Sequence, residues 1–293
     1  MITNLVFEGG GSLGMAYAGV VAALEDKSIM KNIERVAGSS AGSIIALCIT
    51  LKYQPDELKH IMETTNFASF QDDSFGFVRD TNRLLNKFGI CKGKKLKHWI
   101  RSLIKNKVGR EKVTFQELHS SIHNPIELFI TGTNLSRKRT EYFSVFHTPT
   151  MDVATAVCIS SCIPVLFKSI KSNNDIYVDG GVLCNYPLSI FDNNGEPNPQ
   201  TLGFKLVGPD EKRNDRIVTD RVNIDSFPSF ISELIELLLL EIERGIAHNT
   251  KNYWERTVTI PTNGLSGTNF DLTPDEMNTL YANGLKQTHI FLS

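Results

Sequence analysis

The stretch 4-NLVFEGGGSLGMAYAGVVAALED-26 contains the pattern on which the rest of the chain is built. An apolar run at residues 2–7 enters a cluster of glycines, and an amphipathic run at residues 12–27 leaves it. Short apolar segments that lead through small residues into a helical pattern are typical of an α/β sheet. The stretch therefore predicts a strand, a glycine loop and a helix, with loop amides placed to bind a negative group.

This glycine loop allows two interpretations. Gly9, Gly11 and Gly14 match the dinucleotide-binding fingerprint, in which backbone amides cradle a pyrophosphate. That fingerprint also needs an acidic residue about 20 residues further on, at the end of the second strand. Glu34 has about this spacing, but it precedes the strand predicted at residues 35–38. The same amides could instead hold the oxyanion of an acyl-transfer intermediate.

A Gly-x-Ser-x-Gly motif, 38-GSSAG-42, favours the second interpretation. It lies between the strand predicted at residues 35–38 and a helix predicted to begin near Ala41. A nucleophile elbow requires this context, because its serine occupies a strained turn that small neighbours such as Gly38 and Gly42 permit. Ser40 occupies the central position, and Ser39 does not. The motif therefore predicts Ser40 as a nucleophile.

A serine hydroxyl becomes a good nucleophile only when a base takes its proton. None of the seven histidines lies in a convincing strand-end loop with small neighbours. Asp179 follows a short strand predicted at residues 176–178, and Gly180 and Gly181 then allow a tight turn that exposes the carboxylate. Local sequence alone favours an ordinary Asp-Gly turn. In combination with the serine elbow and the glycine loop, however, Asp179 is the candidate base.

Further strands are predicted at residues 126–131, 140–145, 176–178 and 202–207, and they alternate with helices. This alternation predicts a mainly parallel sheet with helices on both faces, in which the strand at 140–145 could pair antiparallel.

The three motifs, in this order, resemble those of the patatin-like phospholipases, and weaker matches continue over almost the whole chain. The resemblance implies a three-layer α/β/α fold in which Ser40 and Asp179 form a catalytic dyad. The implied oxyanion hole consists of glycine-loop amides, from Gly9, Gly10, Gly11 and Gly14. The implied activity is that of a phospholipase A-type acyl hydrolase, which cleaves fatty-acyl esters of membrane glycerolipids through an acyl-enzyme.

One residue departs from the family pattern, and three alternatives stay open. Many members carry Arg or Lys immediately before the last glycine of the loop, whereas this chain has Leu13. The headgroup preference is therefore open, and an esterase or lipase acting on neutral acyl esters is the closest alternative. A catalytically silent binding or storage protein is a second alternative, and a nucleotide-binding module that uses the glycine loop is a third.

Composition narrows the range of partners and compartments. The chain has 293 residues and 41% hydrophobic content, so we expect one domain. Its net charge of −1 leads us to expect no nucleic-acid partner. The sequence shows neither a signal peptide nor a membrane span, so we expect a cytoplasmic or peripheral membrane protein, with export by another route left open. The five cysteines lie in apolar surroundings and are interpreted as buried thiols. We expect no metal and no cofactor.

We expect a single domain over residues 1–293, with a catalytic core at 1–208 and a mainly helical part at 209–293. A lid-like insertion is predicted at about residues 66–112. Within it, residues 87–112 hold ten Lys or Arg against one Glu. Such a segment is either a solvated helical face or a surface that docks on anionic lipid. The apolar side offered for docking comprises Phe88, Ile90, Leu96, Trp99, Ile100, Leu103 and Ile104.

A strongly apolar helix is predicted at residues 228–248. The residues on one of its faces are Ile231, Leu234, Ile235, Leu238, Ile242 and Ile246. Such a face indicates core packing more often than a membrane contact. Packing across an acyl groove, in a homodimer or against a regulatory partner stays open.

Overall fold

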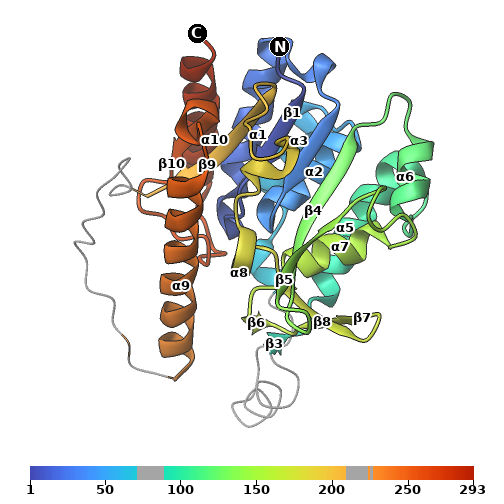
Figure 1. Ribbon diagram of the computed structural model, residues 1–293, viewed down its shortest axis with the longest axis vertical. Helices are drawn as coiled ribbons and strands as arrows, with labels where there is room; N and C mark the ends of the chain where they lie inside the picture. The colour runs from blue at the N-terminus through green and yellow to red at the C-terminus, as the bar shows by residue number, and fades with distance from the viewer. Residues whose placement is uncertain (71–88, 209–223, 225–226) are drawn as a thin grey trace.

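The computed structural model describes residues 1–70, 89–208, 224 and 227–293. In these residues a central sheet carries helices on both faces (Figure 1). Five neighbouring strands of the sheet run parallel, namely β10 (Thr257–Pro261), β9 (Thr201–Val207), β1 (Asn4–Phe7), β2 (Arg35–Gly38) and β4 (Glu127–Asn134). The predicted α/β class with a mainly parallel sheet is confirmed.

Three strand pairings at the β4 end of the sheet are antiparallel. β5 (Arg139–Phe143) pairs with β4 in this way, as the sequence allowed for the strand at 140–145. β8 (Asp175–Asp179) also pairs antiparallel with β4, and β7 (Ile170–Ser172) continues the sheet beyond it. The antiparallel direction of β8 was not predicted, because its short apolar run does not specify a partner strand.

The two faces of the sheet follow from the alternation of side chains along its strands. Leu5 and Phe7 of β1 belong to the larger core, whereas Val6 belongs to a smaller cluster on the opposite face. Tyr186 and Tyr253 complete that smaller cluster. Both faces of the parallel strands are thus covered, which explains the continuous apolar runs at residues 5–7 of β1 and 128–130 of β4.

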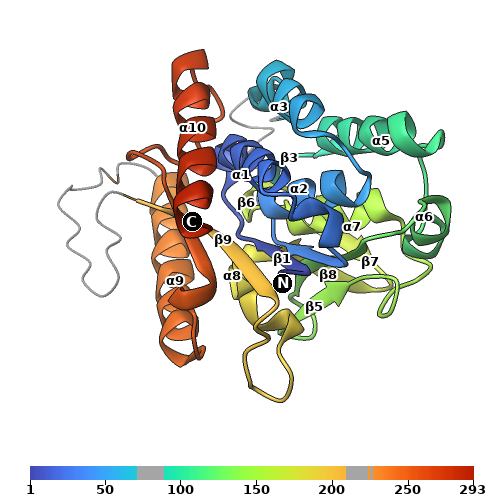
Figure 2. The same ribbon diagram turned by 90° about the horizontal axis from the view of Figure 1, so that it is seen from above.

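Seen from above, the helices form a layer on each side of the sheet (Figure 2). The layer that covers the larger core contains α1 (Met15–Asp26), α2 (Ala41–Thr50), α3 (Pro55–Thr64), α5 (Lys94–Val108), α6 (Phe115–Ser121), α7 (Val153–Ser160) and α10 (Pro274–Phe291). The other layer contains α8 (Gly181–Cys184) and α9 (Phe227–Asn249). No helix within the described residues is long and apolar enough to cross a membrane.

The first helix begins later than the sequence predicts. A 3-10 turn, η1 (Gly11–Gly14), precedes α1, so the helix expected from residue 12 starts at Met15. Gly11 has a φ of +55°, and the Ser12 N–H donates to the Gly267 carbonyl at 2.9 Å. A tight turn that is tied to a distant loop therefore replaces the first helical turn.

The apolar residues of the basic segment that the structure describes lie in or against the folded core. The segment forms β3 (Gly89–Cys91), which pairs with β6 (Val165–Phe167), followed by α5. The apolar residues of α5 are buried in the core, namely Leu96, Ile100, Leu103 and Ile104, and Trp99 packs against it. The four buried residues are therefore not available to insert into lipid, and the docking hypothesis is wrong for them, whereas Trp99 is only partly buried. Phe88, Lys87 and the side chain of Ile90 lie outside the described part, as do residues 71–88 of the predicted insertion.

Most of the described cations of α5 are ion-paired. Lys97 and Arg101 both contact Asp152, and Lys107 contacts Glu57 at 2.8 Å. Lys105 pairs with Glu111 in the same way. The solvated helical face, and not the anionic-lipid surface, is the alternative that this arrangement favours.

The apolar helix predicted at 228–248 is observed as α9. Core packing was expected for one of its faces, and this expectation is wrong for some residues of that face. Leu234 is 41% exposed and Leu238 is 55% exposed, whereas Ile246 packs against the smaller cluster. Ile242 is partly buried, and the side chains of Ile231 and Ile235 lie outside the described part of the chain.

The stacked pair of Phe204 and Phe7 generates a prediction about stability. Phe204 is fully buried, and its ring stacks on Phe7 with centroids 5.0 Å apart. We expect Phe204→Ala to lower the free energy of unfolding by about 3–5 kcal/mol, because it removes buried apolar surface and leaves a cavity. The exposed Phe146 offers the matched control, and Phe146→Ala should cost no more than about 0.5 kcal/mol. Equal losses in denaturant titrations of the two variants would contradict this packing.

Candidate active site

Ser40 lies in a strained turn between β2 and α2. Its φ of 47° and ψ of −121° are unusual for a residue with a side chain, and such strain is typical of functional sites. The Ser40 N–H donates to the Ser160 hydroxyl at 2.9 Å, which helps to hold the turn. The hydroxyl of Ser40 therefore sits at the N-terminus of α2, where the helix dipole favours negative charge.

Gly38 and Gly42 permit this turn by close packing of backbone. A Cβ at Gly42 would lie 2.4 Å from the Phe7 carbonyl oxygen, and one at Gly38 would lie 2.2 Å from the Gly42 oxygen. Side chains at these positions would push α2 away from the ends of β1 and β2. Both predicted glycines are thus where the sequence places them, beside Ser40.

Asp179 is the last residue of β8 and reaches the same region by an indirect route. β4 extends beyond the end of β2, since Gly38 lies opposite Ile130 while β4 continues to Asn134. β8 pairs antiparallel with this extension, and Asp179 lies opposite Gly132. The strand therefore brings its last side chain back toward the edge where β2 ends.

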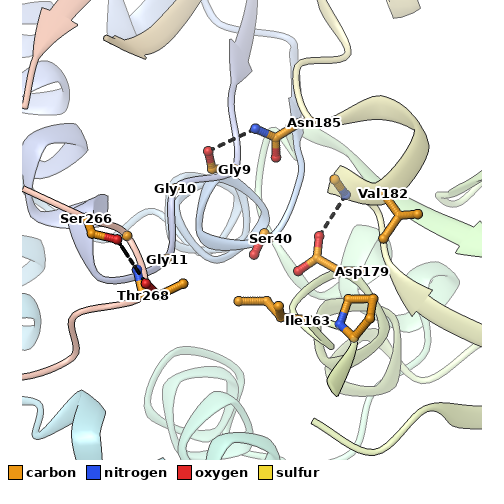
Figure 3. A pocket seen from close by; sticks show the side chains of 13 residues that line it. Gly9, Gly10, Gly11, Ser40, Ile163, Asp179, Val182, Asn185, Ser266 and Thr268 are labelled. Carbon is orange, nitrogen blue, oxygen red and sulfur yellow. Dashed lines mark hydrogen bonds between the residues drawn. The ribbon is translucent and has the colours of Figure 1, made fainter. Parts of the chain in front are cut away.

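The Asp179 carboxylate is buried and only partly hydrogen-bonded. Oδ1 accepts a hydrogen bond from the Gly181 N–H at 2.7 Å. Oδ2 makes no regular hydrogen bond within the described residues. The side chains of Ser40 and Asp179 point toward one another in Figure 3.

Burial determines the acidity of Asp179. Loss of hydration raises its pKa from 3.8 to about 7, although the Gly181 N–H and the Ser40 side chain favour the charged form. A carboxylate with a pKa near neutrality can take a proton and return it at physiological pH. Gly180 and Gly181 make this turn possible, because a Cβ at Gly180 would lie 2.1 Å from Thr131 Oγ1.

The glycine loop provides two amides for an anion. The N–H groups of Gly10 and Gly11 have no acceptor among the described residues, and both residues line the same pocket as Ser40. The Gly9 N–H donates to the Asn185 carbonyl at 3.0 Å, so it is not a free donor. Gly14 packs against Met62 and Ala41 instead of lining the pocket. Of the four glycines predicted for the oxyanion hole, Gly10 and Gly11 fit that role, whereas Gly9 and Gly14 do not.

Leu13 also lies away from the pocket. It is buried in the larger core, so the position at which many family members carry a cation is occupied here by a core residue. Glu34 precedes β2, at the opposite end of this strand from Ser40. It cannot serve as the ribose-binding acid that a dinucleotide site requires at a strand's carboxyl end.

The pocket that joins these groups has a volume of about 270 Å³. Ser40, Asp179 and the glycine loop line one part of it, and the rest is lined mainly by small or apolar residues, namely Ile163, Pro164, Val182, Ser266, Gly267 and Thr268. Figure 3 shows Ile163 and Val182 beside Asp179, and Ser266 and Thr268 beside Gly11. The pocket can hold an apolar chain with a reactive carbonyl near Ser40.

Several residues of the site were not predicted from the sequence. Asn185 lies close to both Gly9 and Gly181, and Ser160 supports the Ser40 amide. The loop at residues 266–268 closes the pocket from the distant C-terminal part of the chain. Two signals were available for Asn185: it follows the Asp-Gly-Gly turn by only a few residues, and it begins the stretch 185-NYPL-188, one of the weaker matches to the family.

Comparison with known proteins identifies the family. The family model of the patatin-like phospholipases matches residues 5–192. The chain therefore belongs to the patatin-like phospholipases.

Three similar proteins illustrate the relationship. The chain is 31% identical to the uncharacterized protein R571 of Acanthamoeba polyphaga mimivirus, over 97% of this chain and 92% of that protein. It is 28% identical to the probable lipid hydrolase 463L of Invertebrate iridescent virus 6, over 64% of this chain and 62% of that protein. The crystal structure of VipD from Legionella pneumophila superposes with a TM-score of 0.70 at 16% identity, over 99% of this chain and 66% of VipD. At this identity, the likeness to VipD concerns the fold alone.

The raised pKa of Asp179 predicts how stability depends on pH. Below about pH 4 the carboxyl is protonated in both the folded and the unfolded chain, and burial carries no ionic cost. Between pH 4 and its folded pKa of about 7, the unfolded chain releases the proton first, so stability falls as pH rises. Asn cannot ionise, so the melting temperature of Asp179→Asn relative to the parent protein should rise over this range and level off above it. A difference that stays constant from pH 4 to 8 would contradict the raised pKa.

Proposed function

We propose that the protein is a phospholipase A-type acyl hydrolase that cleaves fatty-acyl esters of membrane glycerolipids. The observation that carries this proposal is the strained turn at Ser40 facing the buried Asp179, in one pocket with the unbonded amides of Gly10 and Gly11. Membership of the patatin-like phospholipases supports a lipid as the substrate.

The first half of the proposed reaction forms an acyl-enzyme. Ser40 Oγ attacks the ester carbonyl carbon while its proton passes to Asp179. The N–H groups of Gly10 and Gly11 donate to the oxygen that becomes negative. The bond between the carbonyl carbon and the leaving oxygen then breaks, and Asp179 returns the proton to that oxygen as the lysolipid departs.

The second half releases the fatty acid. A water molecule attacks the acyl carbon on Ser40, and Asp179 takes the proton that the water loses. The same amides stabilise the second oxyanion. When the bond to Ser40 Oγ breaks, Asp179 returns a proton to the serine, and the site is restored.

One observation favours hydrolysis of neutral acyl esters as a second candidate function. Among the described residues that line the pocket, none is Lys or Arg. A phosphate headgroup would therefore find no cationic partner in the described lining, and selectivity for it would have to come from elsewhere. The two functions share the same chemistry at Ser40 and differ in the substrate.

Substitution of Ser40 tests the proposed reaction. We expect Ser40→Ala to lower the turnover of phospholipid vesicles by at least about 10³-fold, because it removes the nucleophile. The adjacent Ser39 is buried and makes no regular side-chain hydrogen bond within the described residues, so Ser39→Ala is the matched control and should keep most activity. Released fatty acid is measured by mass spectrometry, with triacylglycerol emulsions assayed in parallel. Turnover of the emulsion alone would favour the neutral-ester function, and equal activity of Ser40→Ala would contradict both.

The pH dependence of turnover tests the role of Asp179. The base acts when it is ionised, so kcat/KM should rise with pH and reach half its plateau near pH 7, the pKa of the buried carboxyl. Asp179→Asn should remove this rise together with most of the activity. A midpoint near pH 4, or a fully active Asp179→Asn protein, would show that another group is the base.

A further inference from the structure

Asn185 holds Gly9 from both sides. Its backbone carbonyl accepts the Gly9 N–H at 3.0 Å, and its side-chain Nδ2 donates to the Gly9 carbonyl at 3.3 Å. The fit is close, since a Cβ at Gly9 would lie 2.2 Å from Asn185 Oδ1 and one at Gly181 would lie 2.7 Å from it. Asn185 thus sits between the glycine loop and the turn that follows Asp179.

This contact fixes the direction of an amide that the proposed reaction uses. The Gly9 carbonyl and the Gly10 N–H belong to one planar trans peptide, so the two groups point in opposite directions. In Figure 3 the Gly9 oxygen is directed to Asn185, on the side of the loop away from Ser40. The Gly10 N–H is consequently turned to the side on which Ser40 lies.

The Asn185 side chain is itself held by α9. The Nδ2 group donates to Glu243 Oε1 at 2.7 Å, so its two hydrogens are shared between Glu243 and Gly9. The other oxygen of Glu243 accepts from Lys205 Nζ at 3.0 Å. Lys205 also pairs with Glu8, the residue immediately before Gly9.

This network is buried and charged, which makes its geometry specific. Lys205 is 5% exposed and Glu243 is 14% exposed. Burial acts to raise the pKa of Glu243, but the charge of Lys205 and hydrogen bonds from Lys205 and Asn185 outweigh it and hold this pKa below its ordinary value. Glu243 is therefore a carboxylate at neutral pH, and both of its oxygens have donors.

We propose that Asn185 and Glu243 are positioning residues for the oxyanion loop, and that α9 is in this way part of the active site. The inference rests on the proposed acyl-hydrolase function. Asn185 orients the peptide between Gly9 and Gly10, and Glu243 orients Asn185. Neither side chain takes part in proton transfer.

Glu243→Gln tests the contact of Glu243 with Asn185 apart from its contact with Lys205. A Gln side chain presents one oxygen and one NH₂ group, so it cannot accept at both of the positions where Oε1 faces Asn185 and Oε2 faces Lys205. The charged Lys205 requires the oxygen, which turns the NH₂ group toward the Asn185 donor. The substitution therefore breaks the link to Asn185 while it preserves the size of the side chain and the contact with Lys205.

Kinetics of four variants test the inference in the full-length protein, with phospholipid vesicles as the probe. Asn185→Ala should lower kcat about 10²-fold, as expected when one oxyanion donor is misdirected, and Glu243→Gln about tenfold. The pH midpoint should stay near 7 in both, because Asp179 keeps its environment. The double variant should lose no more than Asn185→Ala alone. Glu241→Gln, an exposed neighbour that pairs with Arg244 on α9, should behave like the parent protein.

Amide hydrogen exchange provides a readout that does not depend on turnover. We expect the peptide that contains Gly9 to exchange about tenfold faster in Asn185→Ala and Glu243→Gln, and to exchange unchanged in Glu241→Gln. A protein that shows this change but hydrolyses no acyl ester would support the positioning role and contradict the proposed function. The inference is wrong if Glu243→Gln leaves both exchange and kcat unaltered. It is also wrong if the two single losses multiply in the double variant, or if the pH midpoint falls toward 4 because the pocket has opened to water.

Discussion

The burial of one carboxylate is the constraint on which the rest of the site depends. An ionised aspartate is costly inside a protein unless hydrogen bonds or charges offset the loss of hydration. Asp179 has the Gly181 N–H at one oxygen and faces Ser40 with the other, so its charged and neutral forms lie close in free energy. In the proposed reaction, burial thereby supplies the near-neutral acidity for which many hydrolases use histidine. The other parts of the site can then be simple, namely a serine in a turn and backbone amides.

The sheet brings these parts together from distant positions in the sequence. β1 and β2 end side by side, and the segments that follow them carry the glycine loop and Ser40. Parallel strands with helices on both faces commonly place their functional residues at this edge. β8 reaches the edge from the opposite direction only because β4 is longer than β2. The unequal length of two neighbouring strands is therefore as important to the site as any of its side chains.

The sequence predicts the local features of the site well and its long-range contacts poorly. The strand at 35–38, the turn at Ser40 and the glycines around it follow from residue types that permit little else locally. The direction of β8, the strand at Thr257–Pro261 and the loop at 266–268 depend on partners far along the chain, and no local pattern specifies them. The role of Asn185 was not predicted for the same reason, since its partners Gly9 and Glu243 are distant in the sequence. For α9, apolar periodicity alone did not distinguish a face that packs from a face that is exposed, as Leu238 shows.

The pairing of β8 with β4 has a consequence for how the chain tolerates change. Three residue pairs set the register, and they place Tyr177 opposite Asn134, Val178 opposite Thr133 and Asp179 opposite Gly132. A shift by one residue would turn the carboxylate to the other face of the sheet. The exposed turns at residues 135–138 and 173–174, by contrast, can gain or lose residues, because loop length costs little free energy. Insertions and deletions should therefore accumulate in these turns, while β4 and β8 keep a fixed number of residues up to Asp179.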